Sequence, residues 1–326
     1  MSEKLLKISG LSVCYEGEQI LNNICFSVEK GETVGIAGES GSGKSTLLRA
    51  ILRLMGKNGS ITGGQITFRG EELTDMSEKK LRSLCGSEIG MIFQNTGASL
   101  CPTRKIGAQI CESVRAHEKR CGFTTPISGG MSGRKSRREI KDMTLRRFVD
   151  MGLSDGEMIW NSYPSSLSGG MNQRVISAMG LMNRPKWVIA DEPTKGLDAI
   201  LRRQVYRVLK EISETDTEGM IVITHDIALA GALCDRLMVL YKGSIMEAGE
   251  TKTILEHPAH PYTKGLIASL PGKGMNPIGR AVRKKEGNSG CSFYPRCAHA
   301  VDACKNGRIP EAELPDGRKV RCVRYA

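Results

Sequence analysis

Residues 38–46 read GESGSGKST and decide the fold of this chain. This complete G-x-x-x-x-G-K-[ST] pattern follows the apolar run Thr33–Ala37 and opens the helical run Thr46–Leu54. Glycines let the backbone curl so that N–H groups point at phosphate oxygens, and the following helix adds its positive end. Lys44 is expected to reach the β- and γ-phosphates, and Ser45 to hold magnesium. The stretch predicts a nucleoside triphosphate site. The other expected contacts are Gly38, Ser40, Gly41, Ser42, Gly43 and Thr46.

Length and composition bound the class of protein. A chain of 326 residues exceeds one compact core, which indicates one large domain and an appendage. No apolar stretch approaches the roughly 18–20 residues that span a bilayer, and the N-terminus shows no secretory pattern, so we expect a cytosolic chain. The net charge is +12, but aromatic residues make up only 5%, which argues against base-stacking platforms. No nucleic-acid partner is expected.

The order of the predicted elements indicates an α/β core. Residues 4–9 and 24–29 look like strands of an initial β layer, and 103–152 is mostly helical. From residue 171 helices alternate with short apolar strands, which is typical of a largely parallel sheet. Residues 237–241 and 244–248 predict a hairpin that closes this part of the chain.

A second segment narrows the class. Residues 167–174 read LSGGMNQR and place Ser168, Gly169 and Gly170 at a helix N-terminus. A small hydroxyl and two glycines expose N–H groups there, as in a phosphate loop. An ordinary serine N-cap is the alternative for these three residues alone. With Gln173 and Arg174 in place, the segment resembles the signature motif of ATP-binding-cassette (ABC) ATPases. In that family it faces the γ-phosphate bound to the other subunit.

Residues 187–194, WVIADEPT, supply the acidic groups. Four apolar residues predict a buried strand, and Asp191 and Glu192 follow at its C-terminal end, where ligands of open α/β sheets bind. Asp191 is expected to organise magnesium, and Glu192 to act as the general base toward the attacking water.

Smaller matches follow from the same resemblance. Gln94 falls where the family has a glutamine that contacts magnesium and the attacking water. His225 resembles the histidine that contacts the γ-phosphate, and Tyr15 the aromatic residue that stacks on adenine.

The resemblance implies a fold and a division of the chain. The expected fold is α/β: an ABC-type P-loop ATPase core with an antiparallel β subdomain and a helical subdomain, plus a small cysteine-containing extension. Residues 1–250 would form the ATPase domain, with a helical insertion at about 103–183, and residues 251–326 the extension.

The end of the chain indicates the branch of the family. Residues 260–266, HPYTKGL, and 290–297, GCSFYPRC, resemble the extension of oligopeptide, dipeptide and nickel importer ATPases. This implies a peripheral subunit at the cytoplasmic face of the membrane. Its partners would be a second ABC ATPase (a copy or a paralogue), two permeases and an extracytoplasmic binding protein. The alternatives are a soluble ABC ATPase acting on nucleic acid or in translation, and an exporter ATPase.

Four cysteines in the last 36 residues suggest a metal. Cys291, Cys297, Cys304 and Cys322 lack the paired C-x2-C spacing of most structural zinc sites. Iron–sulfur clusters accept looser arrangements, and some relatives with a similar tail carry a [4Fe–4S] cluster. A [4Fe–4S] cluster is the prediction, with zinc and unliganded thiols as the alternatives.

Overall fold

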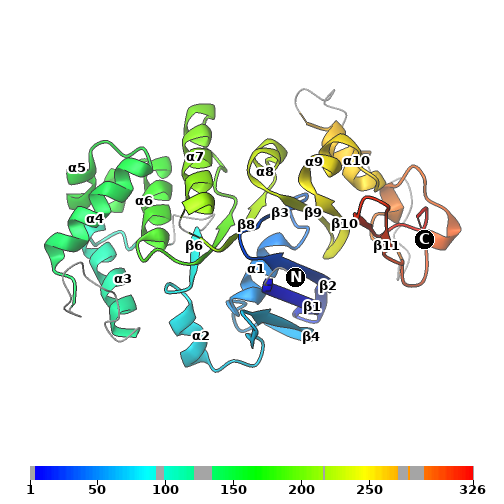
Figure 1. Cartoon of the computed structure of the whole chain (residues 1–326), viewed down its shortest axis with the longest axis horizontal. Coiled ribbons are helices and arrows are strands. Elements are labelled where there is room, and N and C mark those ends of the chain that lie inside the picture. Colours follow the sequence, from blue (N-terminus) through cyan, green and yellow to red (C-terminus); the bar gives the residue numbers. More distant parts are fainter. Residues whose placement is uncertain are drawn as a thin grey trace. The chain divides into compact units, whose positions relative to one another are not determined.

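A computed structural model describes residues 4–92, 99–120, 134–215, 217–270, 278–279 and 290–325. The chain forms two compact units (Figure 1). The first contains residues 1–74 and 221–326, and the second contains residues 75–220. In the described residues no helix has the length and apolar character needed to cross a membrane.

An antiparallel sheet opens the first unit. Its strand order is β2-β1-β4-β5. The strands are β1 (Lys4–Tyr15), β2 (Glu18–Glu29), β4 (Gly59–Phe68) and β5 (Glu71–Glu72). β1 and β2 extend beyond the predicted 4–9 and 24–29, because the turn at Glu16 and Gly17 keeps Tyr15 paired with Glu18. Side chains such as Leu6, Ile8 and Ile66 of this sheet are fully buried.

The second sheet of this unit carries the phosphate loop. Here the strand order is β11-β12-β10-β9-β3-β8. The elements are β3 (Thr33–Ala37), α1 (Lys44–Ile51), β8 (Gly219–Thr224), α8 (Ile227–Leu233), β9 (Arg236–Tyr241) and β10 (Ser244–Glu250). β3 runs parallel to β9, and all five of its residues are buried, as the continuous apolar run predicts. The predicted hairpin is confirmed, with Lys242 and Gly243 at positive φ in its turn.

The second unit is mostly helical. Its elements are α2 (Glu78–Leu84), β6 (Ile89–Ile92), α3 (Ile106–Arg120), α4 (Arg137–Asp150), α5 (Gly156–Asn161), η1 (Pro164–Ser166), α6 (Gly169–Leu181), β7 (Trp187–Asp191) and α7 (Ala199–Thr215). β6 and β7 pair in parallel. Ser136 and Glu139 form a capping box at the start of α4, which satisfies two backbone donors and fixes where this helix begins.

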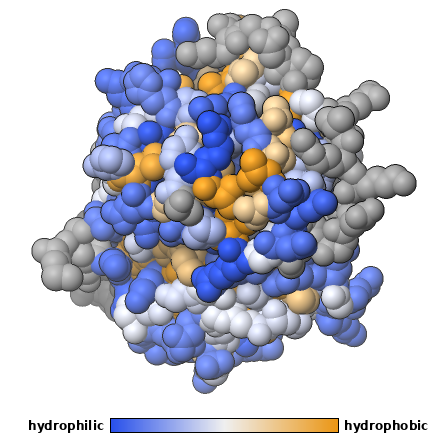
Figure 2. Space-filling view, turned by 90° about the vertical axis from the view of Figure 1, so that its right-hand side faces the viewer, coloured by the Kyte–Doolittle hydropathy of each residue, from blue (hydrophilic) through white to orange (hydrophobic). Residues whose placement is uncertain are grey.

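The described residues of the C-terminal extension form two α-helices, two 3-10 helices and two short strands. They are α9 (Thr251–Glu256), α10 (Pro261–Ala268), η2 (Tyr294–Arg296), η3 (Asp302–Cys304), β11 (Ala312–Glu313) and β12 (Lys319–Val320). β12 pairs with β10, which makes the end of the chain an edge of the second sheet. Figure 2 shows the side of the molecule that lies at the right of Figure 1. Most residues on this face are hydrophilic, and hydrophobic residues gather near its centre. The predicted boundary at residue 250 stays a prediction.

Candidate nucleotide-binding site

The phosphate loop joins β3 to α1, the strand–loop–helix arrangement that the motif requires. Only glycine fits at position 38, because a Cβ atom on Gly38 would lie 2.2 Å from the carbonyl oxygen of Leu240. Gly43, the residue before α1, has φ +103°, and a Cβ atom would lie 2.8 Å from a methyl group of Leu21. These close approaches allow the loop to curl tightly at the carboxyl end of β3.

Lys44 lies across the inside of the loop. Its ammonium group is buried and donates hydrogen bonds to the carbonyl oxygens of Gly38 (2.8 Å) and Glu39 (2.9 Å). The Ser42 hydroxyl is buried and has no hydrogen-bond partner among the described residues. An orphaned buried hydroxyl indicates a place for a polar ligand, since such groups are normally paired. Ser45, at the start of α1, is half-buried.

The turn between β9 and β10 supports the loop from outside. The Gly243 N–H donates to the carbonyl oxygen of Ser42 (2.8 Å), and the Asn22 N–H donates to that of Gly243 (2.8 Å). Of the remaining loop residues, Ser40 and Gly41 are exposed and Thr46 is half-buried. The rigid outer contacts leave the inner face of the loop for a ligand.

The acidic pair lies in the second unit, at the end of β7. All five residues of this strand are buried, and Asp191 and Glu192 are 7% and 6% exposed. Glu192 has φ +49°, a left-handed conformation that costs energy for a residue with a side chain. Such strain concentrates at functional sites, which supports a functional role for Glu192. The Asp191 carboxylate supplies oxygen donors of the kind that magnesium prefers.

The predicted signature segment begins α6, also in the second unit. The Ser168 hydroxyl accepts a hydrogen bond from the Met171 N–H (3.2 Å) and is the N-cap of the helix. Gly169 is exposed, and a Cβ atom on it would meet nothing within 4 Å. Gln173 is buried and donates to the carbonyl oxygen of Pro193 (3.2 Å), directly after the acidic pair. The helix N-terminus is therefore open, as a surface for a partner requires.

The other predicted ATP contacts, Tyr15, His225 and Gln94, lie outside the phosphate loop. Tyr15 ends β1, and its ring lies so close to Gly59 that a Cβ atom there would be 2.7 Å from it. His225 follows β8 in the first unit and is exposed. Gln94 lies outside the described residues. Stacking of Tyr15 on adenine and the roles of Gln94 and His225 stay predictions.

The four tail cysteines come together. Cys291, Cys297, Cys304 and Cys322 line one small cavity of about 10 Å³. Burial raises the pKa of Cys291 to about 11, and the other three thiols add to the effect. In the part of the chain that the structure describes, no group of three or more His, Cys, Asp or Glu side chains is arranged to hold a metal ion. The thiols share a cavity, but their present positions do not form a metal site.

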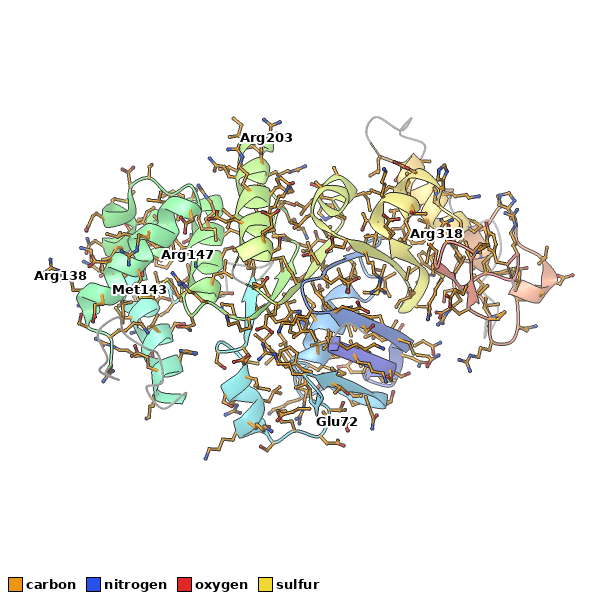
Figure 3. All side chains as sticks on the ribbon, in the orientation of Figure 1. Glu72, Arg138, Met143, Arg147, Arg203 and Arg318 are labelled. Atoms are coloured by element: carbon orange, nitrogen blue, oxygen red, sulfur yellow. The ribbon has the colours of Figure 1, made fainter. Side chains whose placement is uncertain are left out.

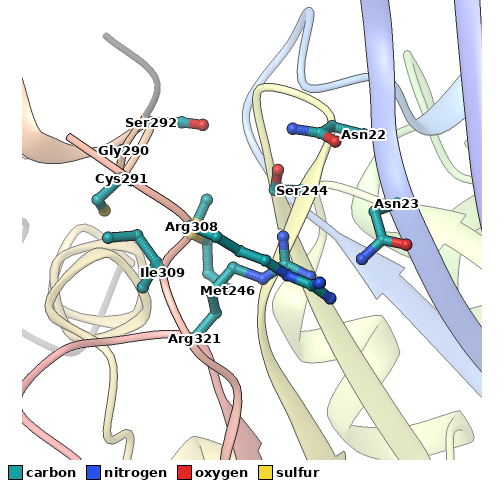
Figure 4. Close-up of a pocket in the computed structure, with 11 residues that line it drawn as sticks. Asn22, Asn23, Ser244, Met246, Gly290, Cys291, Ser292, Arg308, Ile309 and Arg321 are labelled. Atoms are coloured by element: carbon teal, nitrogen blue, oxygen red, sulfur yellow. The ribbon is translucent and has the colours of Figure 1, made fainter. Parts of the chain in front are cut away.

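A wider cavity of about 410 Å³ is lined in part by Cys291 (Figure 4). Asn22 and Ser244 line it from the strands of the first unit, and Arg308, Arg321 and Cys291 line it from the tail. Cys291 borders both cavities, whereas Cys297, Cys304 and Cys322 are buried and line only the small one.

Comparisons with known proteins identify the class. Residues 21–195 match the family described as ABC transporter, and residues 246–304 match the oligopeptide/dipeptide transporter C-terminal region. The dipeptide transport ATP-binding protein DppD of Escherichia coli is 36% identical over 98% of this chain and 96% of its own length. The oligopeptide transport ATP-binding protein OppD of Salmonella typhimurium is 35% identical over 98% and 93%.

Solved structures agree with the fold. The dimeric bacterial ABC transporter cassette MJ0796 matches with a TM-score of 0.64 and 28% identity over 76% of this chain and 98% of its own. Together, fold and loop define a P-loop ATPase of the cassette type. The chain belongs to the ABC transporter family, in the branch with the oligopeptide/dipeptide C-terminal region. It is an ATPase subunit coupled to transport, and its family implies ATP and Mg²⁺.

Proposed function

We propose that this chain hydrolyses ATP to drive an importer of di- or oligopeptides. The observation that carries this proposal is similarity over nearly the whole chain, extension included, to proteins named for dipeptide and oligopeptide transport. Uptake of nickel complexes, which the tail also predicts, is the alternative substrate class.

The residues of the phosphate loop, the acidic pair and His225 have proposed roles, as do Gln94 toward magnesium and Tyr15 toward adenine. The backbone N–H groups of the loop and Lys44 would bind the β- and γ-phosphates, and Ser45 and Asp191 would bind magnesium. Glu192 would take a proton from the attacking water, and His225 would contact the γ-phosphate. The buried position and left-handed backbone of Glu192 support this assignment, because both hold its carboxylate in one place.

Two cassettes would act together. The open N-terminus of α6, with Ser168 and Gly170, would close on ATP held by the loop of a partner cassette. That partner is a copy or a paralogue of this chain. Two permeases would receive the motion through α3 and α4 and through Gln94, which lies outside the described residues. An extracytoplasmic binding protein would deliver the substrate, and the chain would lie at the cytoplasmic face of the membrane.

Substitution of the proposed general base tests the ATPase mechanism. Glu192→Gln keeps the size of the side chain but removes its basicity, so ATPase activity is expected to fall roughly 10²–10⁴-fold while ATP still binds. The matched control is Glu256→Gln at the exposed end of α9, which should leave turnover unchanged. Near-normal turnover of Glu192→Gln would reject the assignment.

Isolation of the intact assembly tests the transport proposal. The tagged chain would be purified from native membranes in mild detergent, and its companions identified by mass spectrometry. Two multi-span permeases and a second cassette support the importer, and the accompanying binding protein can then be assayed with peptides and with nickel. Recovery with ribosomes or DNA instead would reject it.

For the four tail thiols we infer a [4Fe–4S] cluster. Four cysteine side chains that line one cavity could supply the thiolate ligands of an iron–sulfur cluster once iron replaces their protons. A cavity of about 10 Å³ requires the side chains to move apart for a four-iron cluster, whereas a single zinc ion needs less room. Anaerobic purification, visible absorption and iron and zinc content separate these outcomes. Cys304→Ser should remove the bound metal, and Cys234→Ser, a buried cysteine outside the tail, should not.

A further inference from the structure

The extension contacts the phosphate loop directly. Arg296, at the end of η2, forms two hydrogen bonds with the carboxylate of Glu39, the second residue of the GESGSGKST loop. The distances between guanidinium nitrogens and carboxylate oxygens are 2.7 and 3.1 Å. The two side chains are 20% and 35% exposed, so the pair is largely shielded from water. A bidentate pair of this kind fixes orientation as well as charge.

A second contact holds the backbone of the same residue. The Glu39 N–H donates to the hydroxyl oxygen of Tyr262 in α10 (2.9 Å), and the Tyr262 side chain is fully buried. The Glu39 carbonyl oxygen accepts from Lys44. Glu39 is therefore held at its N–H, its carbonyl and its carboxylate, and two of these three contacts come from the extension.

Aromatic side chains fix the position of the Arg296 guanidinium. Its guanidinium lies over the rings of Tyr241 and Phe293, at 5.9 and 5.8 Å from their centroids. Tyr241, Phe293 and Tyr262 also pack on one another, with centroids 4.5 to 5.4 Å apart. Such clusters restrict side-chain freedom. Contacts within the chain thus hold Arg296 against the loop.

The tail also lies beside the phosphate loop at a second place, where residues of both line a cavity of about 410 Å³. Gly41 of the loop and Lys242 line it together with Ser292 and Pro295 of the tail. The tail therefore borders the loop on a side that remains open.

We propose that Arg296 and Tyr262 are positioning residues for ATP binding, which hold the phosphate loop through Glu39. The proposal rests on the proposed function of the loop as the ATP site. A triphosphate carries several negative charges, and the Glu39 carboxylate would oppose it if left uncompensated. Arg296 neutralises this carboxylate and holds it in a two-pronged contact. Tyr262 fixes the peptide group between Gly38 and Glu39. The loop therefore loses less conformational entropy when ATP binds.

The dissociation constant of Mg-ATP for the purified full-length chain tests the proposal. Arg296→Ala is expected to weaken binding about tenfold, because a shielded, charge-assisted pair is lost. Arg296→Lys keeps the charge but not the two-pronged contact, and should recover part of the loss. Glu39→Gln removes the charge that needs compensation. In that background Arg296→Ala should change the affinity less than about threefold.

Two results would overturn the proposal. One is unchanged ATP affinity in Arg296→Ala. The other is an equal loss with and without Glu39→Gln, which would mean that Arg296 acts only by keeping the tail folded. Tyr262→Phe removes a single oxygen, and should weaken ATP binding several-fold even if Arg296→Ala does not fold; unchanged affinity would refute its role. If the unmodified chain binds no Mg-ATP, the proposed function fails rather than this inference.

Discussion

Glu247 anchors the extension to β10, and its replacement should release the tail. This carboxylate is fully buried and accepts from the N–H groups of Ala259 and His260, both at 2.9 Å. It also accepts from Arg318 at 3.2 Å, and Arg318 donates further to the carbonyl oxygen of His257. Figure 3 shows Arg318 among the side chains where the tail meets the strands. One carboxylate thus satisfies two backbone donors and one buried cation.

The expected magnitude follows from these partners. Glu247→Ala leaves two buried N–H groups without their acceptor, at about 1–3 kcal/mol each, whereas Arg318 keeps its ion pair with Asp316 (2.8 Å). The total of about 2–6 kcal/mol, at 1.36 kcal/mol per factor of ten, should raise the equilibrium constant for local opening by roughly 30-fold to 10⁴-fold. Glu247→Gln keeps one acceptor oxygen and should lie between this variant and the unmodified chain.

Hydrogen exchange measured by mass spectrometry on peptides covering 257–270 provides the assay. These peptides contain the two N–H groups that Glu247 binds. Glu256→Gln, nearby and exposed, is the matched control and should exchange like the unmodified chain. Unchanged exchange of 257–270 in Glu247→Ala would refute the reasoning, because it would mean that these hydrogen bonds do not hold the extension.

Two further predictions concern α6 and α10. Ser168→Ala removes the N-cap contact with Met171, so the start of α6 should lose about 1 kcal/mol in local stability. ATPase activity of the assembled cassette pair should fall, while Mg-ATP affinity of the isolated chain stays unchanged; a loss of that affinity would contradict the proposed role in trans. Burial lowers the pKa of His260 to about 4, so below its ordinary value near 6.5 the unfolded chain takes up a proton that the folded chain refuses. Stability of the extension should therefore fall by about 2 kcal/mol between pH 7 and pH 5, measured by hydrogen exchange, and His260→Asn should flatten this dependence while keeping a capping group.

Local sequence patterns predict much of this fold because their causes are local. The apolar run 33–37, the glycines of the loop and the serine before α6 each determine the conformation of a few neighbouring residues. The hairpin at Lys242 and Gly243 was predicted for the same reason. Predicted boundaries fail where pairing continues past the apolar pattern, as in β1 and β2. The short helices α2 and α9 have too few turns to show periodicity and were not predicted, whereas α5 lies within the predicted helical insertion.

Contacts between distant residues carry no local signal. Arg296 and Glu39 are 257 positions apart, and Glu247 and Arg318 are 71 apart. The segments HPYTKGL and GCSFYPRC indicate only the branch of the family. Nothing in their spacing indicates that Tyr262 and Arg296 would meet the second residue of the phosphate loop. The role of Glu39 was missed because its position in the motif accepts any residue.

The contacts of Glu247 and those of Arg296 belong to one continuous series of contacts between β10 and the phosphate loop. Glu247 holds the residues before α10, α10 carries Tyr262, and Tyr262 packs on Phe293 just before Arg296. A defect at Glu247 should therefore lower ATP affinity although Glu247 does not contact the loop. The loss should resemble that of Arg296→Ala and should shrink in a Glu39→Gln background, because both act through the same carboxylate. If Glu247→Ala releases the tail but leaves Mg-ATP affinity unchanged, the extension is attached to the cassette without adjusting its phosphate loop.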